Sequence, residues 1–191
     1  MPDTQRRRWT ADEFLAWEAK QEAWHEFVDG QVRAMVGATR AHNRISANVL
    51  AHLHGRLKGS KCQPFGPDMK IVTPSGNVRF ADVVIDCGVG KPTDLAADEP
   101  SVVVEVLSKS TAWADQTQKL DDYQAIPTMR HILHLAQERA EGELWTREVD
   151  GWRRAPFSGL ETEVSFTAIG VTLPLSAAYE GVPFEEEAEA P

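Results

Sequence analysis

Two carboxylates stand in segments that otherwise have the composition of buried strands. Glu105 interrupts the valine run at residues 102–107, and Asp82 lies within VRFADVVID at residues 78–86. A lone ionised carboxylate in an apolar interior is costly unless it is paired or binds a metal. If the two strands lie side by side, both carboxylates can reach one hard cation. Such oxygen ligands suit Mg²⁺ or Mn²⁺, with waters and a substrate phosphate completing the shell.

The chemistry of such a site would be phosphate ester hydrolysis, because a metal there would generate hydroxide and stabilise charge on the phosphorus. The alternative is structural. Asp82 and Glu105 would then each bond an arginine or a backbone amide, and Arg79 is close enough in the sequence to serve.

A lysine follows on the next predicted helix. Asp115, Lys119 and Tyr123 are spaced at i, i+4 and i+8, so they project from roughly one face. The ammonium of Lys119 could orient the attacking water or neutralise a phosphate oxygen. The alternatives are an i,i+4 salt bridge between Lys119 and Asp115, worth about 0.3 kcal/mol, and simple packing of Tyr123 beneath the site.

The N-terminal half contains the signals of two helices and a hairpin. Thr10 to Glu13 has the spacing of a capping box, which predicts a helix start. Asp29-Gly30 between two alternating runs predicts a hairpin. Apolar residues recur every four positions within residues 39–57, which predicts a helix.

The second half alternates strands with a helix. Residues 69–88 read as two strands joined by Ser75-Gly76-Asn77, and the apolar run at 102–107 predicts a strand buried on both faces. Residues 108–111 supply N-cap types for a helix that runs to about Ala125, before Pro127. HILHLA, GELWTREV and VTLPL predict three more strands. The pattern is α/β (or α+β), with helices packed on a mixed sheet.

Composition narrows the class of protein. The net charge of −9 argues against a protein that simply coats nucleic acid. Five glutamates fall in residues 180–191, which read as a solvated acidic tail. We expect a flexible N-terminus at 1–9, one domain at 10–179 and the tail at 180–191. Cys62 and Cys87 form no Cys-x-x-Cys pair, so neither a zinc site nor a disulfide framework is expected, and a reducing cytoplasm is the default.

Several other classes lack their signatures. No apolar run is long enough for a transmembrane helix, and the charged segment after Arg6 to Arg8 is unlike a signal peptide. The sequence contains no P-loop, dinucleotide-binding fingerprint or nucleophile elbow, so no organic cofactor is expected.

The order of these motifs resembles a known family. The matching pieces are EFVDG at 26–30, the helix that opens with His42, ADVVI around Asp82, PSVVVEVLSKST, and DQTQKLDDY with its D-x₃-K-x₃-Y pattern. Together they resemble the bacterial Uma family of restriction endonucleases, within the PD-(D/E)xK nuclease superfamily. The resemblance covers most of residues 10–175 and rests on the order and spacing of short motifs.

The resemblance implies a restriction-endonuclease-like fold, with a central mixed β-sheet flanked by helices. It also implies a metal held by Asp82 and Glu105, with the backbone carbonyl of Val106 as a further ligand. The superfamily lysine would fall at Leu107, and the family moves it to the next helix, which matches Lys119. The usual prolines are replaced by Ala81 and Lys109.

Two further residues gain a role only from the resemblance. Glu26 becomes an auxiliary ligand of metal or water, where its alternative is a solvent-facing strand residue. His42 becomes an active-site residue, where its alternative is a half-buried histidine on the apolar side of its helix.

We therefore expect a Mg²⁺-dependent (Mn²⁺ possible) endonuclease that hydrolyses phosphodiester bonds of DNA. By analogy with other nucleases of this fold, we also expect a homodimer. The alternatives are a catalytically inactive binding or regulatory protein and a hydrolase of another phosphate ester. His131 and His134 point to opposite faces of their strand, so they do not form a metal pair.

Overall fold

The computed structural model describes residues 9–35, 37–108 and 113–184. The arginines at 6–8, residues 109–111 of the predicted N-cap stretch and most of the acidic tail lie outside these residues. Val182, within the tail as predicted, is buried in the main core.

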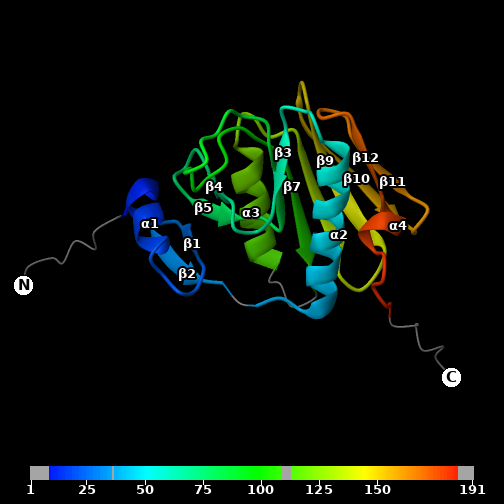
Figure 1. The fold of residues 1–191 in the computed structure, drawn as a ribbon, viewed down its shortest axis with the longest axis horizontal. Coiled ribbons are helices and arrows are strands. Elements are labelled where there is room, and N and C mark those ends of the chain that lie inside the picture. Colours follow the sequence, from blue (N-terminus) through cyan, green and yellow to red (C-terminus); the bar gives the residue numbers. More distant parts are fainter. Residues whose placement is uncertain (1–8, 36, 109–112, 185–191) are drawn as a thin grey trace, which may run out of the picture.

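A six-stranded mixed sheet forms the centre of the molecule (Figure 1). Its strands, in spatial order, are β10 (Gly151–Ser158), β9 (Glu141–Glu148), β8 (His131–Ala136), β7 (Pro100–Leu107), β6 (Val83–Asp86) and β3 (Gln63–Phe65). The pair β7 and β8 is parallel, and every other neighbouring pair is antiparallel. A parallel pair needs a crossover, and helix α3 (Trp113–Gln124) provides it.

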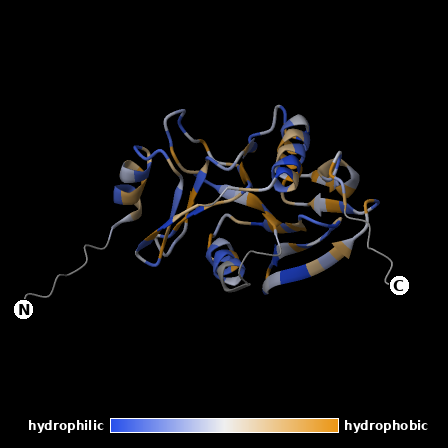
Figure 2. Cartoon of the chain, turned by 90° about the horizontal axis from the view of Figure 1, so that it is seen from below, coloured by the Kyte–Doolittle hydropathy of each residue, from blue (hydrophilic) through white to orange (hydrophobic). Residues whose placement is uncertain are grey.

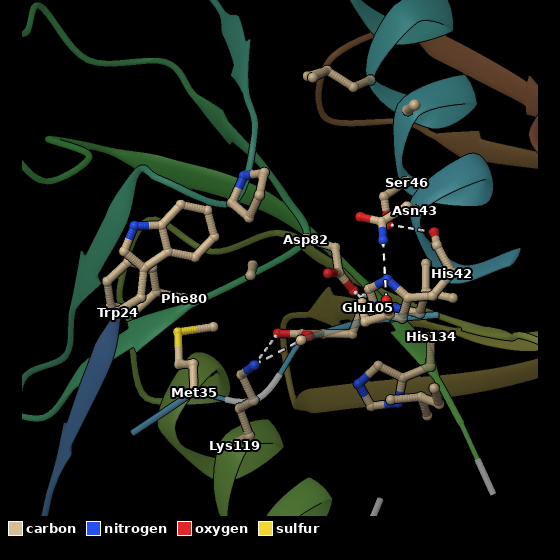
Figure 3. A pocket seen from close by; sticks show the side chains of 18 of the residues that line it. Trp24, Met35, His42, Asn43, Ser46, Phe80, Asp82, Glu105, Lys119 and His134 are labelled. Atoms are coloured by element: carbon tan, nitrogen blue, oxygen red, sulfur yellow. Dashed lines mark hydrogen bonds and ion pairs between the residues drawn. The ribbon is translucent and has the colours of Figure 1, made fainter. Parts of the chain in front are cut away.

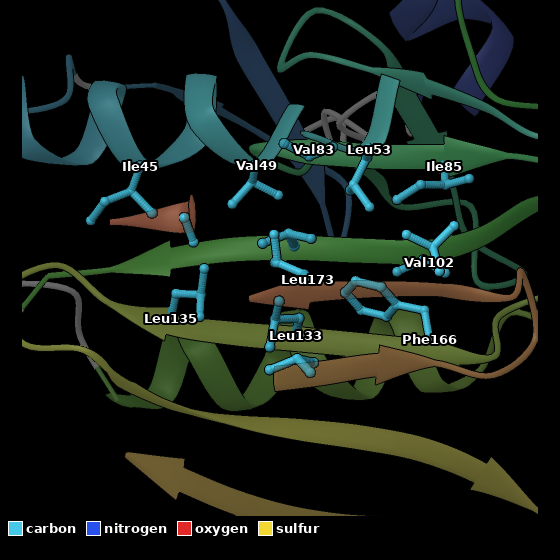
Figure 4. Close-up of a cluster of buried hydrophobic side chains, with 14 of the residues drawn as sticks. Ile45, Val49, Leu53, Val83, Ile85, Val102, Leu133, Leu135, Phe166 and Leu173 are labelled. Carbon is cyan, nitrogen blue, oxygen red and sulfur yellow. The ribbon is translucent and has the colours of Figure 1, made fainter. Parts of the chain in front are cut away.

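Helices cover both faces of this sheet, as the view in Figure 2 shows. On one face lie α2 (Arg40–Arg56), the hairpin of β11 (Glu163–Phe166) and β12 (Val171–Pro174), and the short α4 (Leu175–Ala178). Ile45, Val49 and Leu53 of α2 pack there against alternate residues of the sheet (Figure 4). On the other face lies α3, whose Tyr123 contacts the intervening residues. The predicted burial of both faces of residues 102–107 is confirmed.

A second, four-stranded sheet stands beside the first. Its order is β2 (Gln31–Ala34), β1 (His25–Val28), β5 (Val78–Phe80) and β4 (Lys70–Val72). Helix α1 (Ala11–Glu18) packs on it through a cluster centred on Phe14, Phe27 and Val78. The capping box at Thr10 and Glu13 is confirmed, as is the hairpin at Asp29-Gly30, whose φ angles are 51° and 78°.

The prediction of one continuous strand through VRFADVVID is wrong. The chain leaves the small sheet after β5 and enters the central sheet at β6, so Asp82 lies at the bend between them. The strands β3, β10 and β11 were not predicted. The charged and proline-containing sequence of β10 lies at an exposed sheet edge and lacks a buried face.

No disulfide framework was expected, and a disulfide between the two cysteines contradicts this expectation. Cys62 and Cys87 form a disulfide, because they adjoin the cross-strand pair Gln63 and Asp86 of β3 and β6. Two cysteines 25 residues apart carry no sign of this pairing in the sequence. Disulfides are rare in a reducing cytoplasm. The location in the cytoplasm therefore gains no support from this disulfide and stays a prediction.

Among the helices of the described residues, none has the length and apolar character needed to span a membrane.

Candidate active site

A cavity of about 670 Å³ opens at the end of β7, between the first turns of α2 and the side of α3 (Figure 3). Five residues predicted for the site line it: His42, Asp82, Glu105, Val106 and Lys119. The fold thus brings together side chains from α2, α3, β7 and the bend after β5.

Glu105 is the most enclosed of the four ionisable residues among them, with 7% of its surface exposed. Its Oε1 accepts a hydrogen bond from the Tyr123 hydroxyl at 2.6 Å and lies 2.9 Å from Lys119 Nζ, and Lys119 also donates to Oε2 at 3.1 Å. Burial raises the pKa of the Glu105 carboxyl, and the Lys119 ammonium offsets only part of that rise. Glu105 is therefore paired, as its position in an apolar strand requires.

Lys119 reaches the cavity from α3 and contacts two carboxylates. Besides Glu105, its Nζ lies 3.6 Å from Glu26 Oε1. Burial lowers the pKa of Lys119, but the charges of Glu105 and Glu26 outweigh burial, so its pKa stands above its usual value. The side chain therefore stays an ammonium at neutral pH and presents a fixed positive charge to the cavity. The side chain of Asp115, the partner in the alternative salt bridge with Lys119, lies outside the described side chains.

Glu26 stands behind this lysine and does not line the cavity. Its Oε1 accepts the backbone N–H of Phe80 at 3.2 Å, and its Oε2 accepts Arg79 Nη1 at 3.1 Å. The fully buried Arg79 also donates to Asp122 at 2.7 Å. Arg79 therefore belongs to the support of Lys119 and is not a partner of Asp82 or Glu105.

Asp82 and His42 form the other side of the site. Asp82 Oδ2 accepts the backbone N–H of Val106 at 2.7 Å and lies 3.2 Å from His42 Nε2. Burial lowers the pKa of His42, but the hydrogen bond to Asp82 and its charge outweigh burial, and the net shift is upward. Within the described residues no hydrogen bond reaches the second oxygen of Asp82, so this oxygen is available to another ligand.

The charges around the cavity do not balance. Four carboxylates meet two permanent cations and one histidine in this network: Glu26, Asp82, Glu105, Asp122, Arg79, Lys119 and His42. No cluster of three or more histidine, cysteine, aspartate or glutamate side chains in the described residues is arranged to hold a metal. Mg²⁺, however, commonly takes one or two carboxylates and completes its octahedron with waters and substrate phosphates. The negative excess and the oxygen donors of Asp82 and Glu105 therefore fit such an ion.

Some residues of the site escaped the sequence argument. Tyr123 was expected at most to pack beneath the site, but its hydroxyl holds Glu105. His134 lines the cavity, because β8 pairs with β7 in a register that sets it beside Glu105. Its Nδ1 lies 3.2 Å from Glu143 Oε1, and this hydrogen bond, together with those from Trp145 and Arg154, lowers the pKa of Glu143 to about 2. Strand alternation had separated His134 from His131 but could not reveal this neighbour.

Comparisons with known proteins agree with this picture. The fold matches the crystal structure of a "putative nuclease belonging to DUF820" from Anabaena variabilis, with a TM-score of 0.72 over 90% of this chain and 97% of that one, at 12% identity. Two uncharacterized proteins of Synechocystis sp. are each 29% identical, covering 91% and 83% of this chain and 92% of their own lengths.

Architecture and neighbour together define a protein of the restriction-endonuclease-like fold. The Uma2 family, described as "Putative restriction endonuclease", matches residues 11–176. The chain belongs to that family, whose description points to a nuclease.

Proposed function

We propose that this protein is a metal-dependent endonuclease that hydrolyses phosphodiester bonds of DNA. The observation that carries the proposal is the meeting of Asp82, Glu105 and Lys119 in one cavity, where carboxylates outnumber permanent cations. A charge excess of this kind is costly for a merely structural cluster and suits a site that takes a cation and a phosphate.

Each residue has a distinct task in this proposal. Asp82 and Glu105, with the carbonyl of Val106, would hold Mg²⁺ or Mn²⁺. When bound, the ion would supply a hydroxide and neutralise charge on the phosphate. Lys119, held as an ammonium by Glu105 and Glu26, would orient the attacking water or stabilise a phosphate oxygen. His42 would fix the Asp82 carboxylate through their 3.2 Å contact.

The first test is calorimetric. We expect the wild-type protein to bind Mn²⁺ and Mg²⁺, and an Asp82→Ala/Glu105→Ala double variant to bind neither. Absence of binding by the wild type would leave a nuclease scaffold whose acids are structural.

The second test is cleavage of plasmid and oligonucleotide DNA with Mn²⁺. Glu105→Gln keeps the size of the side chain and removes its charge, so we expect at least a roughly thousand-fold loss of rate from the lost ligand, with the fold intact by circular dichroism. Cleavage retained in that variant would remove Glu105 from the mechanism. Nucleotides and small phosphodiesters, tested in parallel, would reveal a preference for another phosphate ester.

A second candidate function is a non-enzymatic binding or regulatory role. The net charge of −9 favours it, because duplex DNA is usually held by basic surfaces. DNA binding that weakens with salt but never leads to cleavage would support this role. By analogy with nucleases of this fold we also propose a homodimer, which light scattering would test.

A further inference from the structure

The cavity has an aromatic residue that the catalytic proposal does not use. Trp24 precedes β1, lines the cavity and is 47% exposed. The other four tryptophans whose side chains are described pack against buried clusters: Trp9, Trp17, Trp145 and Trp152. Trp24 belongs to none of the buried clusters of the described residues, so its indole serves no core.

The small sheet holds the backbone of Trp24 in place. Its backbone carbonyl accepts the N–H of Met35 at 2.8 Å, which extends the ladder of β1 and β2. Figure 3 shows Trp24 and Met35 on one side of Asp82 and Glu105, and His42 on the other. The cavity therefore has an apolar wall next to its charged centre.

This wall and the carboxylates line the same cavity, so a phosphate held at the carboxylates would bring its neighbouring groups to the side of Trp24. Each phosphate of a nucleic acid is flanked by nucleosides, and any base can stack on an indole, with a gain of about 1–3 kcal/mol per base. The volume of about 670 Å³ lies within the range of pockets that enclose small organic ligands. A base inside a duplex cannot present its face to such a wall unless it leaves the stack.

The scarcity of positive charge around the cavity also favours an unpaired strand as the ligand. Among the described residues that line the cavity, Lys119 is the only lysine or arginine, and it is already paired with Glu105. A protein that grips duplex DNA gains affinity mainly from many contacts between basic side chains and phosphates. Here the affinity has to come from the base, which an unpaired strand offers freely.

We propose that Trp24 stacks on an unpaired nucleobase beside the scissile phosphate, so that the site accepts single-stranded nucleic acid in preference to duplex. The inference rests on the proposed nuclease function, because it assigns the substrate class of that same site. It identifies Trp24 as a binding residue with no part in the chemical step.

The test separates binding from cleavage. Binding of a fluorescein-labelled single-stranded 12-mer, and of the duplex of the same sequence, is measured by anisotropy in EDTA at low salt, where no metal-dependent cleavage occurs. We expect tighter binding of the single strand. We expect Trp24→Ala to weaken it roughly five- to 150-fold, in line with the loss of one stacked base.

Two further variants guard against a general effect. Trp24→Phe keeps an aromatic face, so it should retain most of the affinity. Leu160→Ala removes a comparably exposed apolar side chain (44%) that does not line the cavity, and it should bind like the wild type. Equal affinity of the wild type and Trp24→Ala, a preference for duplex, or no binding of the single strand would each overturn the inference.

Cleavage with Mn²⁺ is then measured separately on the same proteins. Single-strand binding that depends on Trp24, without any cleavage, would keep the inference and remove the proposed nuclease function. Cleavage of duplex DNA that is unchanged in Trp24→Ala and lost in Glu105→Gln would keep the proposed nuclease function and remove the inference.

Discussion

Two buried lysine–glutamate pairs of this fold have similar geometry and different surroundings. Lys70 Nζ lies 3.0 Å from Glu18 Oε2 and joins α1 to β4, and Lys119 Nζ lies 2.9 Å from Glu105 Oε1 at the cavity. Lys70 also stands 5.1 Å from the ring of Phe80, and Glu18 is its one carboxylate partner in the described residues. Around Lys119, by contrast, Glu26 lies at 3.6 Å, and Asp82 adds a further negative charge.

The difference shows what marks a functional site in this molecule. Burial of an ion pair is common to both regions, so burial alone carries no functional information. The pair of Lys70 and Glu18 is neutral, whereas the cavity pair sits in an excess of carboxylates. Such an unbalanced cluster is what a site that binds a cation needs before its ligand arrives.

The largest difference in stability between the two regions is expected when the glutamate of each pair is replaced. Glu18→Gln leaves Lys70 buried without a carboxylate, so we expect a loss of about 3–5 kcal/mol in the free energy of unfolding. Glu105→Gln leaves Lys119 near Glu26, so this variant should lose less than half as much free energy of unfolding. Urea unfolding of both variants measures the contrast.

Activity should follow the opposite order. Folded Glu18→Gln should cleave DNA like the wild type, whereas Glu105→Gln should be inactive. Equal losses of stability in the two variants would mean that the cavity pair is as structural as the remote one.

His131 lies at the start of β8, the strand that also carries His134, and it does not line the cavity. Its protonation tests a second buried polar group outside the candidate site. His131 is 1% exposed, and its Nε2 accepts the N–H of Ala168 at 3.2 Å, which requires the neutral ring. Burial, and to a lesser degree the charge of Arg153, lowers its pKa to about 4. The unfolded chain takes up the proton near pH 6.5, so stability falls as the pH drops from there towards 4, by up to about 3 kcal/mol.

The measurement for His131 is the slope of the free energy of unfolding against pH. Unfolding free energies of the wild type and of His131→Gln are measured between pH 7 and 4, since carboxylates titrate in the same range in both proteins. The variant should lose the part of the slope due to His131 and keep its cavity chemistry. Parallel slopes in the two proteins would show that His131 carries a proton in the folded state.

The sequence was informative where local periodicity decides the structure. The helix over residues 40–56, the Asp29-Gly30 hairpin and the doubly buried strand β7 follow from spacing alone. Contacts across the fold were harder. The sequence places Arg79 near Asp82, yet Arg79 turns to Glu26 and Asp122, partners 53 and 43 residues away.

In the candidate site, too, some features could be predicted from the sequence and others depend on contacts across the fold. The types and order of Asp82, Glu105 and Lys119 suggested their chemistry. The hydroxyl of Tyr123 on Glu105 depends on how α3 lies on the sheet, and the bend at Asp82 depends on the change from one sheet to the other. Neither has a local signature.

Metal-induced stabilisation is the smallest of these effects and tests the charge imbalance directly. An ion that binds only the folded protein stabilises it by about 2.7 kcal/mol at a hundred times its dissociation constant. We expect Mn²⁺ to stabilise the wild type and Glu18→Gln equally, because the remote pair offers no excess charge. Asp82→Asn can still accept the N–H of Val106 but lacks the anionic ligand, so Mn²⁺ should leave its melting temperature unchanged. A full Mn²⁺ shift in Asp82→Asn would place the ion elsewhere, and a reduced shift in Glu18→Gln would mean that the two regions are coupled.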